Sequence, residues 1–344
     1  MMRQMLNTLY VTTGDAYLSL DGETIVLTLD GEVLKRYPLL NFESIIKFGH
    51  MGVSPALLGH CARHNIPVCF LSRTGRFLAR IVGEYRGNVV LRKQQYRVSD
   101  DENQSLKIAR NFVAGKIYNA RRVLDRALRD HALRINTDLF KQKMEYLKDA
   151  LNGASEAPSL EVLRGIEGRA STDYFGVFDE MILQQKENFI FSVRSRRPPL
   201  DKVNALLSFL YTLLTHDCAS ALETVGLDPY VGFLHRDRPG RMSLALDLME
   251  EMRPFIVDRL VLSMINRKQI TVSDFDTEFV GSVLLNDEGR KKVLVAWQEA
   301  KQDRIKHPFL GESISRGLIP HVQAQLLTRY IRGDLDEYPP FFWK

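Results

Sequence analysis

The interpretation of this chain starts from residues 228–258, DPYVGFLHRDRPGRMSLALDLMEEMRPFIVD. The stretch predicts a turn, a short apolar run ending at His235, a basic loop and then a helix. We expect Ser243 to cap the helix, because a serine hydroxyl can accept a backbone N–H that lacks an intrahelical partner. Pro254 has no N–H to donate to the Glu250 carbonyl, so the helix should kink or loosen there. The basic loop carries three arginines around a Pro-Gly pair, Arg236, Arg238 and Arg241.

Steps of about 100° per residue sort the helix into an acidic face and an apolar face. The apolar face, expected to pack inward, contains Ala245, Leu248, Met252 and Ile256. The acidic face contains Asp247, Glu250, Glu251 and Asp258. Carboxylates three residues apart repel one another unless something compensates. The face is therefore either solvated or a cation site. The nearby histidine and arginines favour a cation site beside a bound phosphate, which suggests metal-assisted phosphodiester chemistry.

Length and composition indicate a soluble globular protein. The 344 residues suffice for about two domains. The hydrophobic fraction is 45%, the charged fraction 26% and the formal net charge +5, which is compatible with a nucleic-acid partner. The three cysteines, Cys61, Cys69 and Cys218, form no close metal-ligand pair and fit a reducing cytoplasm. We see no signal-like N-terminal run and no apolar stretch near the roughly 18–20 residues that span a bilayer, and therefore expect a cytoplasmic protein without a membrane partner.

Residues 1–98 predict a β-sandwich-like domain. Runs rich in β-branched and aromatic residues alternate with turn pairs at hairpin spacing. The expected strands are residues 10–13, 17–20, 25–29, 33–37, 66–71, 77–82 and 89–92. Ser54 and Pro55 are a suitable cap and first position for one short helix over residues 54–64. Four basic side chains in this domain either contact phosphate or are merely solvated: Arg63, His64, Arg73 and Arg76.

A polar run at residues 99–105 predicts a linker, and residues 106–344 predict a larger all-α domain. The fold class is thus α+β. A long helix over residues 106–134 has a basic face that is either solvated or a DNA groove, with Lys107, Arg110, Lys116, Arg121, Arg122, Arg126 and Arg129. Residues 152–158 predict a loop. Glu167 lies between Gly165 and Gly168, either as a turn residue or where another backbone approaches closely.

A basic loop at residues 194–204 leads into a strongly apolar helix over residues 203–222. Asp201 is its expected cap, and Arg196, Arg197 and Lys202 are candidate contacts to nucleic acid. Further amphipathic helices are expected over residues 289–306 and 317–332. The tail, residues 334–344, should either dock or be disordered.

Four sequence pieces, taken in order, resemble the CRISPR-associated adaptation integrases of the Cas-one family. They are GIEGRA at residues 165–170, RPPLDKVNALLS at 197–208, GLDPYVGFLH at 226–235 and SLALDLMEEMRP at 243–254. The resemblance covers nearly the whole chain. Residues 319–335 and the terminal YPPFFWK resemble the type I-C branch.

The resemblance implies an N-terminal β domain, a helical C-terminal domain and a homodimer built largely through the β domains. It implies two such dimers flanking a dimer of the companion protein Cas-two, with a Cas-four nuclease as a further partner. The implied activity is the insertion of short double-stranded DNA fragments into the CRISPR repeat array. Residue by residue, the family's metal ligands fall on Glu167, His235 and Glu250, with Asp247 as the nearby acidic partner.

Two carboxylates and one imidazole suit Mg²⁺ or Mn²⁺ and leave positions for water and phosphate. The attacking group would be a 3′-hydroxyl, giving transesterification, or water, giving nuclease activity. Because a metal-bound imidazole must be neutral, activity should fall in acid. Two alternatives remain open: a stand-alone metal-dependent nuclease for branched DNA and a non-catalytic DNA-binding scaffold.

Overall fold

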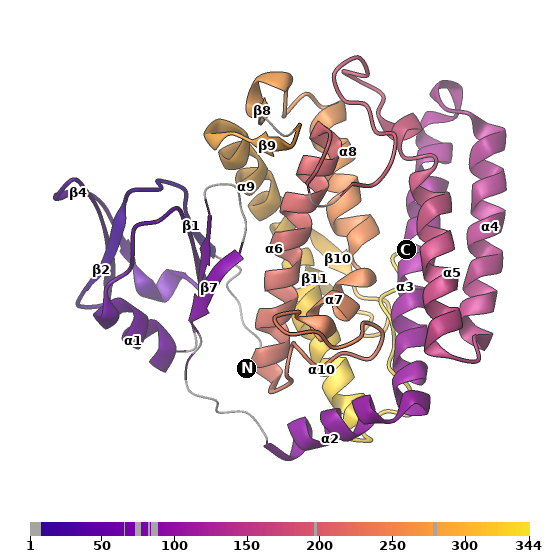
Figure 1. Cartoon of the computed structure of the whole chain (residues 1–344), viewed down its shortest axis with the longest axis horizontal. Helices are drawn as coiled ribbons and strands as arrows, with labels where there is room; N and C mark the ends of the chain where they lie inside the picture. Colours follow the sequence, from indigo (N-terminus) through magenta and orange to yellow (C-terminus); the bar gives the residue numbers. More distant parts are fainter. Residues whose placement is uncertain are drawn as a thin grey trace. The chain divides into compact units, whose positions relative to one another are not determined.

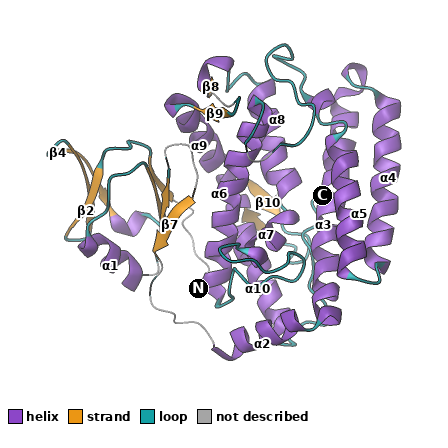
Figure 2. Ribbon diagram, in the orientation of Figure 1, coloured by secondary structure: helices purple, strands orange, loops and turns teal. Residues whose placement is uncertain are grey.

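The structure is a computed structural model of the chain and describes residues 8–64, 66–72, 77–81, 83, 89–195, 198–277 and 281–344. The chain divides into two compact units, Met1–Arg86 with Leu285–Gln302 and Gly87–Leu284 with Asp303–Lys344. Strands dominate the described part of the first unit and helices that of the second (Figures 1 and 2). The α+β class expected from the sequence is therefore confirmed.

The first unit contains two sheets. One is antiparallel, with β2 (Tyr17–Asp21), β3 (Thr24–Leu29) and β4 (Glu32–Pro38). The other is mixed, in the order β1 (Thr8–Val11), β5 (Ser44–Phe48), β6 (Val68–Leu71), β7 (Phe77–Ile81). Strands β5 and β6 are parallel, so a crossover is needed, and α1 (Pro55–Arg63) provides it. The unit also contains α9 (Asp287–Gln302).

Local sequence signals account for the shape of this unit. Asp30 and Gly31 adopt positive φ angles of 52° and 88°, as a two-residue hairpin turn requires. The predicted cap of α1 is confirmed, because the Ser54 hydroxyl accepts the Leu57 N–H at 3.2 Å. Apolar residues of both sheets and of α1 form one core, including Leu18, Ile25, Ile45 and Val68 from the strands and Leu57 from α1.

The boundary between the two predicted domains is different in the structure. Residues 89–92, expected to be a strand, begin α2 (Val89–Asp100). Residues 99–105, expected to be a linker, end α2 and begin α3 (Glu102–His131). The polar run was misread because Asp101 is a helix cap, and its carboxylate accepts the N–H groups of Asn103 and Gln104. The predicted phosphate contacts Arg73 and Arg76 lie outside the described residues.

Helices α3, α4 (Thr137–Glu156) and α5 (Leu160–Phe175) lie side by side in the second unit (Figure 1). The loop expected at residues 152–158 is mostly the last turn and a half of α4. Glu167 lies in the interior of α5, neither in a turn nor beside a closely approaching backbone, since among the described residues a Cβ at Gly165 or Gly168 would meet no atom within 4 Å. Further along the chain lie β8 (Phe275–Thr277), β9 (Val283–Leu285), β10 (Arg304–Lys306), β11 (Ser313–Ser315) and α10 (Ile319–Ile331).

The apolar helix α6 (Lys202–Val225) is the central core helix of this unit. Asp201 caps its start, accepting the Asn204 N–H at 2.7 Å, and Gly226 ends it with a φ of 89°. By length and composition α6 could cross a membrane, so the expectation that no segment is long and apolar enough was wrong. Since 67% of its apolar window is buried within the protein, packing explains its composition.

The loosening expected at Pro254 is present. Helix α7 (Ser243–Glu250) passes through a turn into a π-helical segment, Arg253–Asp258, and then into α8 (Arg259–Asn266). The Arg259 N–H donates to the Pro254 carbonyl five residues back, because the proline cannot continue the ordinary ladder. Ser243 is the first helical residue rather than the cap, and its hydroxyl donates to the Arg236 carbonyl at 3.2 Å.

The C-terminal tail docks on this segment. The Phe341 N–H donates to Glu251 Oε2 at 2.6 Å, and the Tyr338 hydroxyl donates to Glu251 Oε1. The Phe341 ring stacks on Phe255 with centroids 4.8 Å apart. Asn119 on α3 completes the attachment by bonding the Trp343 N–H and the Phe341 carbonyl.

Burial raises the pKa of Glu251 to about 8, although three donors partly oppose the shift. Because this folded-state pKa exceeds the unfolded value of 4.5, the folded state binds the extra proton between these values. The contribution of Glu251 to stability is therefore greatest below pH 4.5 and declines up to pH 8, by at most about 1.4 kcal/mol per pH unit.

Glu251→Gln should remove this decline. The amide can mimic the protonated acid, with its oxygen accepting from Phe341 and its nitrogen donating to the Tyr338 hydroxyl. Chemical denaturation between pH 5 and pH 8.5 measures the free energy of unfolding of both proteins. We expect the difference to grow in favour of the variant as the pH rises. A constant difference across this range would show that Glu251 is ionised in the folded protein throughout.

Candidate active site

The candidate site is organised by the side chain of Asp247, which is fully buried in the middle of α7. Its carboxylate accepts the backbone N–H groups of Phe233, Leu234 and His235 at 2.7, 2.9 and 3.0 Å. A carboxylate that accepts several backbone N–H groups fixes both the loop and itself. Asp247 thus attaches the loop that carries His235 to the helix that carries Glu250.

Gly232 permits this close approach. A Cβ atom at this position would lie 2.8 Å from Asp247 Oδ2 and 2.9 Å from Ser243 Cβ. Any larger residue would push the loop away from α7, and the three N–H groups would lose their acceptor.

The same carboxylate orients the imidazole of His235. His235 Nδ1 lies 2.6 Å from Asp247 Oδ1. Because this oxygen also accepts a backbone N–H, it acts as an acceptor toward the ring, so Nδ1 carries the proton. In the neutral form of the ring the lone pair is then on Nε2. Metal-binding histidines typically have this arrangement, in which the second ring nitrogen donates to a carboxylate.

Helix α5 is attached to the same loop through Arg164. Its Nε donates to the Leu234 carbonyl at 2.8 Å, directly before His235 in the chain. Glu167 follows Arg164 by three residues and therefore lies one helical turn further along. The contact positions Glu167 beside the segment that carries His235, although 68 positions separate the two residues in the sequence.

Lys116 on α3 joins Glu167 to Glu250. Its ammonium group forms an ion pair with Glu167 Oε1 and lies 2.8 Å from Glu250 Oε2. The Ser171 hydroxyl also donates to Glu167 Oε1, at 3.0 Å. On the other side, Arg253 contacts Glu250 Oε1 at 3.0 Å. Two carboxylates and two cations from four separate segments thus meet in one place.

These charges keep Glu250 ionised. Burial alone would raise the pKa of its carboxyl group, but Arg253, Lys116 and His235 together lower the pKa to about 2. Glu250 is therefore an anion at neutral pH, whereas burial raises the pKa of the adjacent Glu251 to about 8. The acidic face predicted from the sequence is not solvated, because all four of its carboxylates are buried.

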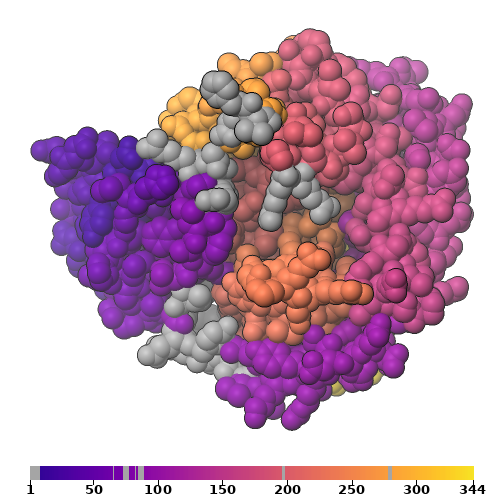
Figure 3. Space-filling view, viewed as in Figure 1, coloured from indigo at the N-terminus to yellow at the C-terminus, as the bar shows by residue number. Residues whose placement is uncertain are grey.

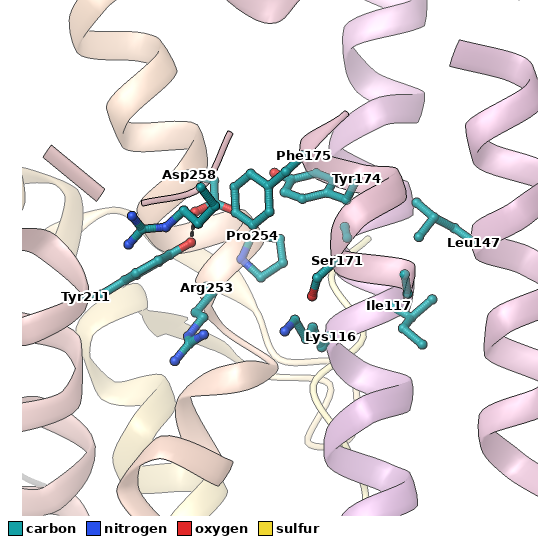
Figure 4. Close-up of a pocket in the computed structure, with 13 residues that line it drawn as sticks. Lys116, Ile117, Leu147, Ser171, Tyr174, Phe175, Tyr211, Arg253, Pro254 and Asp258 are labelled. Atoms are coloured by element: carbon teal, nitrogen blue, oxygen red, sulfur yellow. Dashed lines mark hydrogen bonds between the residues drawn. The ribbon is translucent and has the colours of Figure 1, made fainter. Parts of the chain in front are cut away.

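Asp258, the fourth of these acids, belongs to a buried polar cluster beside the site. It accepts the Tyr211 hydroxyl at 2.5 Å (Figure 4). The guanidinium groups of Arg253 and Arg194 lie 4.9 and 5.3 Å from the centre of the Tyr211 ring. Burial raises the pKa of Asp258 to about 6, although its tyrosine and arginine neighbours partly oppose the shift. The cluster fixes Arg253 in position behind Glu250.

The donor set fits a hard divalent cation. Glu167 and Glu250 already share one cationic group, and His235 has the tautomer that frees Nε2. Within the described chain, Glu250 Oε2 is a buried oxygen with no well-aligned hydrogen bond. Across the described ranges, no three His, Cys, Asp or Glu side chains are close enough to hold an ion as they stand. The ammonium group of Lys116 lies between the two carboxylates instead.

The predicted contacts to nucleic acid have different outcomes. Arg236 and Arg238 are exposed on the loop before α7, which lies on the surface shown in Figure 3, and Arg241 is half-buried. Lys202 is half-buried and donates to the Asn188 carbonyl at 3.3 Å. Arg196 and Arg197 lie outside the described residues.

The basic face predicted on α3 is mostly engaged within the protein. Arg110 and Arg121 donate to the carbonyl groups of Ala157 and Met144. Intramolecular carboxylates pair with four more of its members, Lys116, Arg122, Arg126 and Arg129. Lys107 is exposed. Arg110, Lys116 and Arg121 bond to neighbouring segments. Arg122, Arg126 and Arg129 pair with aspartates of α3 itself. The reading of this helix as a DNA groove therefore stays a prediction.

Sequence reasoning gave no specific role to Lys116, Arg253 and Arg164, which assemble the site. Arg253 had a detectable signal, because it follows Glu250 by three residues and such pairs meet on a helix surface. Lys116 had none, because its partners are 51 and 134 positions away.

A buried carboxylate and imidazole site beside exposed arginines is typical of an enzyme that acts on phosphodiesters. The model of the family described as CRISPR associated protein Cas1 matches residues 9–299. The chain belongs to this family, which is the Cas-one family indicated by the sequence motifs.

Relatives support the same assignment over the full length. A CRISPR-associated endonuclease Cas1 of Chlorobaculum tepidum is 51% identical over 343 residues, and one of Rhodospirillum rubrum is 53% identical over 352 residues. Each alignment covers 100% of both chains.

Solved structures share the fold. A Cas1 protein from Thermotoga maritima has a TM-score of 0.81 at 26% identity, covering 95% of this chain and 97% of its own. A casposase bound to its integration product has a TM-score of 0.84 at 22% identity, covering 98% and 95%. The latter likeness is evidence of the fold alone.

Asp247→Asn should damage the site more than the sequence-based role of a nearby acidic partner implies. The amide presents N–H groups where the carboxylate accepted hydrogen bonds, which leaves backbone donors unpaired at a cost of about 1–3 kcal/mol. Loss of the acceptor for a ligand histidine typically costs about 10–100-fold in metal affinity or activity. DNA cleavage rates and thermal unfolding measure both effects.

Asp237→Asn is the matched control, because Asp237 lies exposed on the same loop and should behave like wild type. Wild-type cleavage by Asp247→Asn would show that His235 needs no buried acceptor.

Proposed function

We propose that this Cas1 protein is a divalent-metal-dependent DNA integrase and endonuclease that inserts short DNA fragments into a CRISPR array. The carrying observation is the convergence of Glu167 and Glu250 on one cation, beside a His235 ring whose Nδ1 is held by buried Asp247. We assign Glu167, His235 and Glu250 as the ligands of Mg²⁺ or Mn²⁺.

When bound, the metal supplies Lewis acidity, polarising the phosphodiester and stabilising the charge that develops during displacement. The protein's residues create the setting for this chemistry. Asp247 holds Nδ1 of His235, so that Nε2 is the ring nitrogen left to bind the metal. Arg253 and Lys116 keep Glu250 anionic despite its burial. Arg236, Arg238 and Arg241 bind phosphates of the DNA, where guanidinium forks match the phosphate oxygens. A 3′-hydroxyl of the incoming fragment displaces a 3′-oxygen of the repeat, and water substitutes for it in cleavage.

Names of relatives and neighbours motivate the proposed partners. One structural neighbour is a Cas6-RT-Cas1–Cas2 complex with a TM-score of 0.83 at 24% identity. A Cas4/Cas1 fusion of Geobacter sulfurreducens is 38% identical over 336 residues. We infer a cytoplasmic homodimer, two copies of which flank a Cas2 dimer, with a Cas4 nuclease as a further partner and type I-C as the branch. The exposed apolar residues Val33 and Leu34 on β4 offer a sheet edge for dimer formation.

The decisive assay joins a labelled double-stranded fragment to a supercoiled plasmid carrying a CRISPR repeat, with Mn²⁺ or Mg²⁺. Glu167→Gln and Glu250→Gln should each lower joining and cleavage by at least about 100-fold, since direct ligands exceed the 10–100-fold range of their supporting residues. Asp173→Asn, which removes an ion pair to Lys143 elsewhere on α5, is the control and should retain activity.

The same assay separates the alternatives. A stand-alone nuclease would cut branched DNA without joining ends and without Cas2. A DNA-binding scaffold would do neither, with or without metal. Full joining by Glu250→Gln would contradict the assigned ligand set.

DNA affinity should depend steeply on salt, because arginines displace counterions from phosphates. Replacing Arg236 or Arg238 by Ala should weaken duplex binding about equally for unrelated sequences and reduce the slope of log K against log salt by about 1. Fluorescence anisotropy between 50 and 300 mM NaCl, roughly the range in which such slopes are resolved, gives the measurement. Arg332→Ala, an exposed arginine on a different segment, should leave the slope unchanged. An unaltered slope for both loop variants would remove the loop from the DNA interface.

A further inference from the structure

We propose that the Lys116 ammonium group acts as a placeholder, taking the place of the divalent cation in the metal-free protein. When the metal binds, this ammonium group leaves Glu167 and Glu250. The inference rests on the proposed function, because it concerns the same two ligands. It assigns Lys116 a positioning role in the metal-free protein and a position away from the carboxylates in the metal-bound protein.

The position of the Lys116 nitrogen between two carboxylates supports this role. Lys116 extends from α3, whereas Glu167 and Glu250 belong to α5 and α7. One nitrogen atom contacts a carboxylate oxygen of each, Glu167 Oε1 and Glu250 Oε2 at 2.8 Å. A cation shared by two carboxylates from different helices occupies the kind of position that a bridging metal would take.

The charges around Glu167 and Glu250 also support the withdrawal of one side-chain cation. The side chains of Lys116 and Glu250 are only 12% and 3% exposed, so unbalanced charge there is costly. Two carboxylates are balanced by Lys116 and Arg253 in the metal-free arrangement. Adding a divalent cation to these four groups would leave two net positive charges, of which the buried Asp247 carboxylate offsets only one. Withdrawal of one side-chain cation restores the balance when the metal binds.

Of the two side-chain cations, Lys116 is the one that can withdraw and Arg253 is the one that stays. Arg253 is fixed, because it contacts Glu250 Oε1 at 3.0 Å and its guanidinium lies 4.9 Å from the centre of the Tyr211 ring. Lys116 has a flexible stem and a compact ammonium group that keeps no fixed fork geometry. It also borders a cavity of about 20 Å³ together with Ser171, Pro254 and Asp258, and Figure 4 shows its side chain beside that of Ser171. Since a space of this size holds about one water molecule, the ammonium end of the lysine can shift without displacing packed side chains.

Lys143 offers a matched comparison within the same helical unit. It forms a single ion pair with Asp173 at 2.7 Å, and the two side chains are 21% and 15% exposed. Its pair resembles that of Lys116 in distance and burial but involves only one carboxylate, which is not an assigned ligand. An effect shown by Lys116 and not by Lys143 is therefore specific to the shared position.

The first test measures binding of Mn²⁺ alone to the full chain, with free Mn²⁺ followed by electron paramagnetic resonance at pH 8. Lys116→Met keeps the length of the apolar stem and removes the competing charge. We expect it to bind Mn²⁺ about tenfold more tightly than wild type, the scale on which one nearby charge acts. Its metal-free melting temperature should fall, and its rise on adding Mn²⁺ should exceed that of wild type. Lys143→Met should bind Mn²⁺ like wild type.

The second test uses the wild-type protein, so it does not depend on the folding of a variant. A short pulse of an amine-acylating reagent, followed by peptide mass spectrometry, reports how readily each lysine amine reacts. Because the Lys116 amine leaves both carboxylates when the metal binds, adding Mn²⁺ should increase its modification several-fold and leave Lys143 unchanged. Unchanged Lys116 labelling, or weaker Mn²⁺ binding by Lys116→Met, overturns the placeholder role.

The outcomes also separate this inference from the proposed function. If wild type binds Mn²⁺ and Glu250→Gln does not, the metal site stands, and the Lys116 results decide the placeholder role alone. If wild type, Glu250→Gln and Lys116→Met bind Mn²⁺ equally weakly, the metal site and the placeholder role both fail.

Discussion

The candidate site depends on one buried carboxylate. Asp247 accepts three consecutive backbone N–H groups and the Nδ1 proton of His235, which makes the loop and helix α7 one rigid piece. Arg164 then attaches α5 to that piece through the Leu234 carbonyl. Segments remote in sequence are thereby attached to one another, and Lys116 joins the carboxylates of Glu167 and Glu250. Neighbouring residues set the charge state of Glu250, whereas Asp247 fixes the position of the loop and of the His235 ring.

Burial has opposite effects on two adjacent glutamates at the end of α7. Glu250 is surrounded by cations and remains an anion, suited to chemistry with metal and phosphate. Glu251 faces Gln323, Tyr338 and the Phe341 N–H and is a structural anchor for the C-terminal tail. Gly115 permits this packing, because a Cβ there would lie 3.1 Å from Glu251 Cβ. The tail thus packs directly behind the helix that carries the site.

Local sequence signals predicted the local structure well. Asp-Gly pairs gave the hairpins, Ser54 and Asp201 gave helix caps, and Pro254 marked the break after α7. Predictions failed where a residue type is common in two kinds of structure. Asp101 caps a helix where a linker was expected, and Gly165 and Gly168 are tolerated inside α5, where an added Cβ would meet no atom within 4 Å. The identity of the three ligands came from family resemblance, since periodicity alone cannot show that an acidic helix face is buried or that Lys116 crosses to two other helices.

The π-helical segment at Arg253–Asp258 has a consequence for how this region can vary. A π turn accommodates one residue more than the α-helical path it replaces, so the extra residue is absorbed locally between α7 and α8. Removing a residue from a regular α-helix would rotate everything after it by about 100°, whereas removing one here would return the segment to an α-helix and leave the flanking helices in phase. The cost would fall on contacts made inside the widened turn, those of Arg253 with Glu250 and of Asp258 with Tyr211. The π turn thus confines the effect of a one-residue change in length to the side chains that support the site.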